Sequence, residues 1–194
     1  TIFHTSAMIR TFAATQNLEP HALAAVDRSG KIIAMLAGCH VRTHKGLPAC
    51  LSSRAIQYAE PLCNVDPAGG EALRTLIGHH DRYMRQRALF CEVRVHNDPQ
   101  SWDHGTLIES GYGLHGYINY IVELDSDIDV LWQNLHKRLR QKIRSTFRKQ
   151  IEIRDDHSPE GIERHYRLLQ TSFARAKVPL LGREMFETAL TQLP

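Results

Sequence analysis

The sequence feature that most constrains the fold is a pair of extended stretches joined by a tight turn. Residues His21–Val26 and Lys31–Thr43 are rich in apolar and β-branched residues, and Asp27-Arg28-Ser29-Gly30 connects them. This pattern predicts a β-hairpin. A second turn at Lys45-Gly46 and a further extended stretch at Ala49–Arg54 predict a third strand. The first third of the chain is therefore expected to hold a three-stranded antiparallel meander.

The segments around this meander predict helices that alternate with strands. Thr5 precedes a helical apolar pattern that ends near Asn17, before Pro20. Residues 71–87 carry one apolar stripe at helical spacing and lead into Leu89–Val95, where apolar and polar residues alternate. A meander followed by a helix and a strand indicates a mixed sheet, so the expected fold class is α/β (α+β).

The second half of the chain predicts mainly helices. A short helix over Ser101–Ser110 stops at Gly111, and a strand follows over Leu114–Leu124. The longest helix is expected over Ile128–Lys149. The prediction ends with a short strand at 151–154, a helix opened by Ser158-Pro159, and a last helix that starts after Gly182 and is still running at Pro194. This strand–helix–helix order is typical of the opening of a second α/β unit.

The charge of the chain is concentrated in one segment. Residues 1–124 hold eleven Lys or Arg and eleven Asp or Glu, whereas residues 125–194 hold thirteen and ten. Between Leu131 and Gln150 there are seven basic residues and no acidic one. The net charge of +3 therefore lies in residues 125–194, and the positive charge is densest in this predicted helix.

Composition excludes several protein classes. Hydrophobic residues make up 42% of the 194 and Gly plus Pro about a tenth, so the chain is globular and neither collagen-like nor disordered. The four cysteines form no C-x-x-C pair, which favours buried reduced thiols and a cytoplasmic location over a disulfide framework. No apolar run is long enough for a transmembrane segment. Because the first residue is Thr1, we expect the chain to be a fragment.

Several common sites lack support in the sequence. The histidine pairs His79-His80 and His40-x-x-x-His44 have no matching Cys/His cluster, so no metal site is predicted. No nucleophile elbow, Walker loop or dinucleotide fingerprint occurs. Gly69-Gly70, placed before the predicted helix, is either an ordinary loop or a seat for an anion on free backbone N–H groups.

The basic helix has two interpretations. It is either the solvated face of an ordinary amphipathic helix or a surface for a polyanion. Ordinary surface helices place Glu near Lys because like charges one turn apart repel. The lack of any acid over twenty residues favours a phosphate-bearing partner, namely nucleic acid, a nucleotide-linked substrate or an anionic lipid.

A second polar group is predicted on the strand over residues 89–95. Glu92 and Arg94 are two residues apart, so both side chains lie on one face of the strand. They form either an ion pair within the strand or part of a cleft. The third predicted strand is followed by two further polar side chains, Arg54 (in the stretch 52–54) and Tyr58. We expect them near the same cleft.

With these elements placed, the chain resembles the GNAT acyltransferase fold and, more closely, the FemAB-like proteins. The residues that carry the closer resemblance are Leu131-Trp132, 137–144 and 148–153, which are similar to a basic stretch of the FemAB-like proteins. The resemblance implies a GNAT-like mixed sheet over residues 1–124, a connecting basic helix over 125–150 and the beginning of a second, truncated GNAT-like domain over 151–194.

The resemblance also implies an activity. FemAB-like enzymes, which include peptidoglycan-bridge aminoacyltransferases and cellulose- or exosortase-associated relatives, transfer an acyl or aminoacyl group to an amine of a cell-envelope precursor. The donor would be aminoacyl-tRNA or acyl-CoA, and no bound cofactor is expected. The pyrophosphate loop of GNAT enzymes that use CoA is missing, since Ile56–Pro61 stands in its place. The fragment is therefore expected to be inactive alone, with no assigned catalytic residue.

The resemblance implies substrate-binding roles for two groups of residues. The first-domain side of the cleft would hold Arg54, Tyr58, Glu92 and Arg94. Phosphates of tRNA or of a nucleotide- or lipid-linked precursor would contact Arg140, Arg144, Arg148 and Lys149. The alternative is a binding module without catalysis, in which a degenerate GNAT-like fold docks on nucleic acid or on the surface of an anionic membrane.

Overall fold

The computed structural model divides the chain into two compact units, which are described separately. It describes residues 1–42, 49–95 (49 and 50 by backbone alone), 104–116, 118, 122, 124–149, 151 and 154–193. The first unit comprises residues 1–114 and 157–194, and the second comprises residues 115–156. Residues 157–194, which lie within the segment 151–194 that we predicted to begin a second domain, group with the sheet in the first unit.

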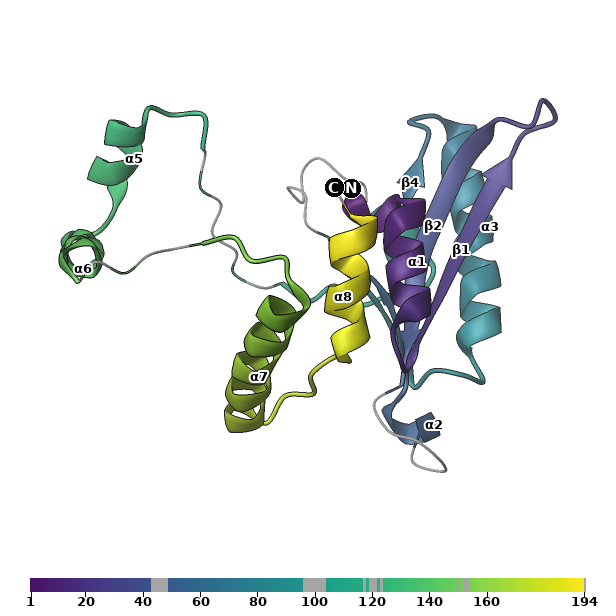
Figure 1. Ribbon diagram of the computed structural model, residues 1–194. Coiled ribbons are helices and arrows are strands. Elements are labelled where there is room, and N and C mark those ends of the chain that lie inside the picture. The colour runs from purple at the N-terminus through teal and green to yellow at the C-terminus, as the bar shows by residue number, and fades with distance from the viewer. Residues whose placement is uncertain are drawn as a thin grey trace. The chain divides into compact units, whose positions relative to one another are not determined.

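The first unit is built on a mixed sheet (Figure 1). Strands β1 (Leu18–Val26), β2 (Ile32–Val41) and β3 (Arg54–Gln57) pair antiparallel in this order, and β5 (Phe90–Val93) pairs parallel to β3. A short strand, β4 (Leu62–Cys63), pairs with β2. The predicted fold class, α/β (α+β) with a mixed sheet whose antiparallel meander is flanked by helices, is confirmed.

The hairpin turn forms as the sequence predicts. One carboxylate oxygen of Asp27 accepts hydrogen bonds from the backbone N–H groups of Ser29 (2.8 Å) and Lys31 (3.0 Å). Gly30 takes a φ of +86°, which only glycine adopts without strain. The first strand begins earlier than predicted and runs through Pro20, which is tolerated because β1 lies at the edge of the sheet.

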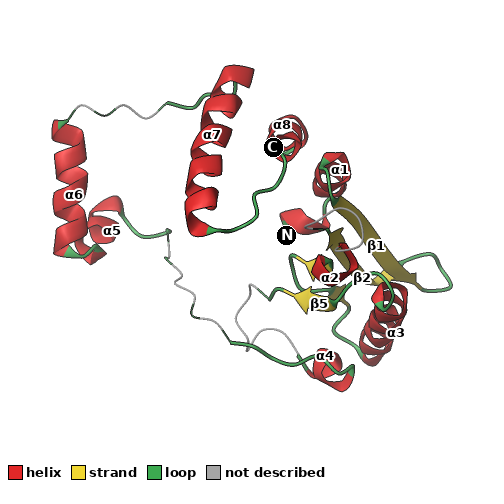
Figure 2. Cartoon of the chain, turned by 90° about the horizontal axis from the view of Figure 1, so that it is seen from below, coloured by secondary structure: helices red, strands yellow, loops and turns green. Residues whose placement is uncertain are grey.

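Helices cover both faces of this sheet (Figure 2). The residues of β2 alternate between two cores: Ala34 and Leu36 pack with helix α3 (Pro67–Met84), whereas Cys39 and Val41 pack with helix α1 (Ser6–Ala14). A 3₁₀ turn, η1 (Ile2–His4), precedes α1, and the Thr5 side chain caps α1 as predicted. The short helix α4 (Gly105–Glu109) ends before Gly111, also as predicted.

Two further helices belong to the first unit. Helix α7 (Pro159–Ala176) is capped by Ser158, and α8 (Arg183–Gln192) ends two residues earlier than the end of the sequence. Helix α8 packs against α1, where Met185 and Leu193 join the core around Phe12. Both helices were predicted, but the packing of α8 against α1 was not.

Four further predicted elements differ in the structure. The third strand occupies Arg54–Gln57, and residues 49–52, predicted as part of this strand, form helix α2 (Ala49–Ser52). The predicted helix over 71–87 begins at Pro67, because Asp66 caps it. The predicted strands at 114–124 and 151–154 fall partly outside the described residues, and their described residues form no strand.

The second unit contains two helices where one was predicted. Helix α5 (Ile128–Asn134) and helix α6 (Lys137–Arg148) are separated at Leu135 and His136, whose backbone is extended. His136 caps α6, and Arg140 donates a 2.7 Å hydrogen bond to the Gln133 carbonyl at the end of α5. The sequence contains neither Gly nor Pro at this break, so the helical periodicity does not reveal it.

Candidate functional site

Two parallel neighbouring strands of the first unit present polar side chains on one face of the sheet. In the register of this pair Arg54 lies opposite Phe90 and Ile56 lies opposite Glu92. Because alternate residues of a strand share a face, Arg54 and Tyr58 are on the same face as Glu92 and Arg94. Ile56 packs into the core beneath α1, so this is the face that α1 covers. We had predicted that Arg54 follows the third strand. In the structure it is the first residue of β3.

The Glu92–Arg94 pair is an ion pair within the strand. Arg94 Nε lies 2.7 Å from Glu92 Oε1, in hydrogen-bonding geometry. The Arg94 backbone N–H donates a 2.9 Å hydrogen bond to the Gln57 carbonyl, which extends the β3–β5 pairing by one residue. Strand spacing alone predicts this pair, and the structure confirms it.

The aromatic ring of Tyr58 brings the two strands' polar residues together. The guanidinium carbon of Arg94 lies 5.1 Å from the centre of the Tyr58 ring, a cation–π distance. The ring also stacks on Phe3 at 5.6 Å and Phe12 at 5.3 Å. Burial raises the pKa of Tyr58, so its hydroxyl stays protonated at neutral pH.

Arg54 contributes a second positive charge to this face. Its Nε atom is buried and has no hydrogen-bond partner in the described part of the chain. The charges of Arg94 and Arg54 both act to lower the pKa of Tyr58, although burial outweighs them. The four side chains predicted to line the cleft therefore lie together, with two cations to one carboxylate, and we call them the β3–β5 site.

Two residues close to this site were missed by the sequence analysis. Glu60 follows Tyr58 by two residues and is only 2% exposed, which is unusual for a carboxylate. His4 lies near it: burial and then the N-terminal amine lower the pKa of His4, and Glu60 acts in the opposite direction. The sequence signal was the unusual Ile56–Pro61 segment, which we had interpreted only as the absence of a pyrophosphate loop.

The Gly69-Gly70 pair does not form an anion seat. Both residues lie in the first turn of α3, where Gly69 N–H donates to the Asp66 carboxylate (2.7 Å) and Gly70 N–H to the Asp66 carbonyl (3.1 Å). A side chain at Gly69 would place its Cβ 2.2 Å from the Asn64 carbonyl oxygen. Glycine is therefore required for close packing, and the chain's own carboxylate occupies the helix N-terminus.

The opposite face of the sheet holds one group with metal-ligating side chains. Within the described residues, ligand atoms of His80, Asp81 and Cys91 lie within 4.8 Å of one another. Asp81 Oδ1 lies 3.0 Å from His80 Nδ1 and accepts a 2.7 Å hydrogen bond from the Tyr112 hydroxyl. These side chains thus form a hydrogen-bonded network between α3 and the sheet. Burial raises the pKa of Cys91 to about 11.

The predicted phosphate contacts all lie in the second unit. Arg140, Arg144 and Arg148 belong to α6, and Lys149 follows it directly. A cavity of about 320 Å³ is lined by Lys137, Arg140 and Arg144 together with Trp132, Gln133 and Gln141. The guanidinium carbon of Arg144 lies 5.6 Å from the Trp132 ring.

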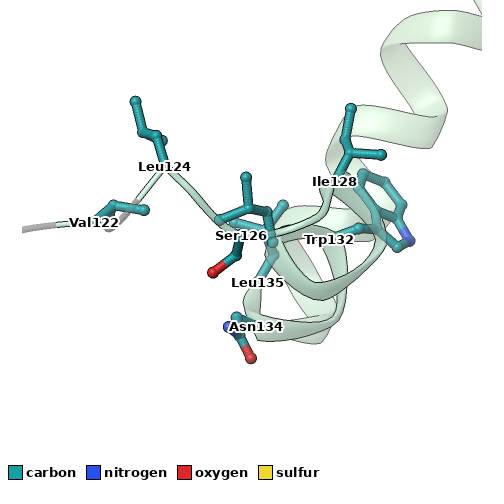
Figure 3. Close-up of a pocket in the computed structure, with 8 residues that line it drawn as sticks. Val122, Leu124, Ser126, Ile128, Trp132, Asn134 and Leu135 are labelled. Atoms are coloured by element: carbon teal, nitrogen blue, oxygen red, sulfur yellow. The ribbon is translucent and has the colours of Figure 1, made fainter.

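A larger apolar cavity of about 630 Å³ lies in the same unit (Figure 3). Its wall includes Val122 and Leu124 before α5, and Ile128, Trp132 and Leu135 within and after it. Trp132 lines both of these cavities, so a basic surface adjoins an apolar one.

Comparison with known proteins gives one solved structure of interest. No family model matches the chain, and no curated protein matches it. A crystal structure of a probable acetyltransferase aligns with 56% of this chain and 70% of its own, at 13% identity and a TM-score of 0.36. Every helix in the described residues is too short or too polar to cross a bilayer.

Proposed function

We propose that this protein is an acyltransferase of the FemAB-like type, which transfers an acyl or aminoacyl group to an amine of a cell-envelope precursor. The observation that carries the proposal is the β3–β5 site. A parallel strand pair, connected through α3, presents two guanidinium groups, a protonated phenol and a carboxylate on one face.

Acyl transfer needs a fixed positive charge where negative charge develops. The amine nitrogen bonds to the acyl carbonyl carbon, the bond from that carbon to the donor oxygen or sulfur breaks, and the amine proton leaves with the donor. Negative charge accumulates on the carbonyl oxygen between these events. Arg94 suits this role because Glu92 and the Tyr58 ring both hold its guanidinium in place.

The remaining residues support substrate binding. Arg54 offers a buried Nε–H that has no partner among the described residues and is available to an anionic or carbonyl group of a substrate. The cations Arg140, Arg144, Arg148 and Lys149 are proposed to bind phosphate groups. The donor classes are acyl-CoA and aminoacyl-tRNA. A free helix N-terminus could bind the pyrophosphate of CoA, but Asp66 already occupies that of α3, so aminoacyl-tRNA is favoured.

A turnover assay tests this proposal. The intact protein is incubated with labelled acyl-CoA or aminoacyl-tRNA and an amine acceptor, and transfer of the label is followed. Arg94→Gln is expected to lower kcat/KM by about a hundredfold, as the loss of one oxyanion donor does. Arg167→Gln is the matched control, because it breaks a 2.8 Å ion pair with Glu163 on α7, outside the site. No transfer from either donor, or equal rates in Arg94→Gln and the control, would refute the proposal.

A further inference from the structure

We infer that helix α6 docks the protein on a membrane surface that carries anionic phospholipids. This inference names the partner for the phosphate-binding role proposed above. It does not depend on acyl transfer, because membrane binding and turnover are measured separately.

The first support is the apolar face of α6. Leu139, Ile143 and Phe147 follow one another at intervals of four residues, so they lie on one side of the helix. No residue of α6 is buried, and the side chains of Leu139 and Phe147 are 46% and 75% exposed. An exposed apolar stripe of this kind marks a surface that binds an apolar partner.

The second support is the position of the cations. Arg140 and Arg144 lie on one side of the apolar stripe, and Lys142 and Lys149 lie on the other, as the helical repeat places them. Cations on both flanks of an apolar stripe are typical of a helix that lies in a membrane interface, where long basic side chains reach the headgroups. A nucleic acid would favour aromatic rings on which its bases stack, whereas two of the three residues of this stripe, Leu139 and Ile143, are aliphatic.

The third support is the lack of compensating charge. In the described residues no side chain of α6 forms an ion pair with an acid, and several of its cations are four residues apart. Arg140 to Arg144 and Arg144 to Arg148 are such pairs, which repel each other and cost helix stability. A negatively charged surface relieves this repulsion.

The cavities beside α6 fit the two parts of a phospholipid. Lys137, Arg140 and Arg144 line the smaller cavity and offer a seat for a phosphate. The larger cavity presents Leu124, Ile128 and other apolar side chains next to Trp132, and tryptophan favours the boundary between headgroups and acyl chains.

Vesicle sedimentation tests the inference. The intact protein is mixed with vesicles of equal parts phosphatidylglycerol and phosphatidylcholine, or of phosphatidylcholine alone, at physiological salt. We expect sedimentation with the anionic vesicles only, and release as salt rises. Each cation near the surface contributes roughly fivefold to partitioning, so Lys142→Gln/Lys149→Gln should weaken binding about 25-fold.

Two further variants complete the test. Phe147→Ser should also weaken binding to the anionic vesicles, because it removes the most exposed part of the stripe. Arg28→Gln/Lys31→Gln removes two exposed cations from the hairpin turn and should leave binding unchanged. Equal sedimentation with both vesicle types, equal loss in the control, or binding of single-stranded RNA without vesicle binding would overturn the inference.

Discussion

At the scale of single residues, the β3–β5 site shows how a charged side chain is held in place on a sheet. Arg94 is fixed by an ion pair to Glu92 and by the face of Tyr58, and Phe3 and Phe12 pack on that ring in turn. An arginine fixed from two sides loses little side-chain entropy when a substrate binds. The same contacts would be weak in a flexible loop.

Cysteine reactivity is expected to differ sharply within the first unit. Cys39 is fully buried, and burial raises its pKa from 9.0 to about 12, whereas Cys63 is exposed. The thiolate fraction of Cys39 is therefore about a thousandfold lower than at its ordinary pKa. Alkylation with iodoacetamide at pH 8, followed by mass spectrometry, should modify Cys63 rapidly and Cys39 only in denaturant. Equal rates for the two thiols in the native protein would contradict the packing of β2 against α1.

Local spacing predicts the Glu92–Arg94 contact but not its neighbours. Two residues on one strand share a face whatever the rest of the chain does, so this pair follows from the sequence alone. Tyr58 and Arg54 reach the pair only because β3 and β5 are parallel with one particular register. That register depends on the whole sheet, so the sequence analysis grouped these residues but could not predict their contacts.

At the scale of elements, capping residues decide where the helices begin. Periodicity predicted the core of α3 but placed its start four residues late, because Gly69 and Gly70 resemble a loop. Asp66 overrides that tendency by accepting a hydrogen bond from Gly69 N–H. Likewise the extended backbone at Leu135 and His136 divides the predicted long helix, and Arg140 stabilises the break through the Gln133 carbonyl.

Removal of the α3 cap should destabilise the first unit. Asp66→Ala leaves the N–H of Gly69 without its acceptor, and the loss of an N-cap costs about 1 kcal/mol. Urea denaturation followed by circular dichroism should show a lower midpoint with an unchanged m-value. Asp66→Ser is the matched control, since serine also caps helices and should retain most of the stability. Equal midpoints for the alanine and serine variants would show that the cap does not stabilise the helix.

At the scale of the whole molecule, contacts between distant segments escape sequence patterns. Helix α8 has the predicted apolar positions, yet nothing in its sequence says that Met185 would join Met8 and Phe12 in one core. The 2.8 Å hydrogen bond from Arg10 to Gln192 links the same two helices across nearly the full chain. The mixed sheet was predictable because its elements are adjacent in sequence, whereas this packing depends on which surfaces the sheet leaves uncovered.

The packing between the sheet and α3 makes the stability of the first unit depend on pH. Both ring nitrogens of His21 on β1 are buried and have no hydrogen-bond partner among the described residues, and the ring lies 5.0 Å from that of His80 on α3. Gly38 makes room for it, since a Cβ there would lie 2.9 Å from His21 Nε2. Burial first, and then the charges of His80 and His40, lower the pKa of His21 to about 4, and Glu19 opposes this shift.

The consequence is a loss of stability in acid. In the unfolded chain His21 binds a proton near pH 6.5, whereas in the folded protein it stays neutral until about pH 4. Its contribution is therefore fully present above pH 6.5 and is lost as the pH falls from there toward 4. Since a pKa difference of one corresponds to about 1.4 kcal/mol, about 3 kcal/mol of unfolding free energy depends on this one side chain.

Urea denaturation of the wild type and of His21→Gln across this pH range isolates that contribution. Glutamine has no charged form, so the variant should lose less stability than the wild type on acidification, by about 3 kcal/mol at pH 4. Carboxylates such as Glu19 titrate in both proteins, and their effects cancel in the difference between the two curves. Parallel pH profiles would mean that His21 is solvated in the folded protein, and the burial of β1 beneath α3 would then be wrong.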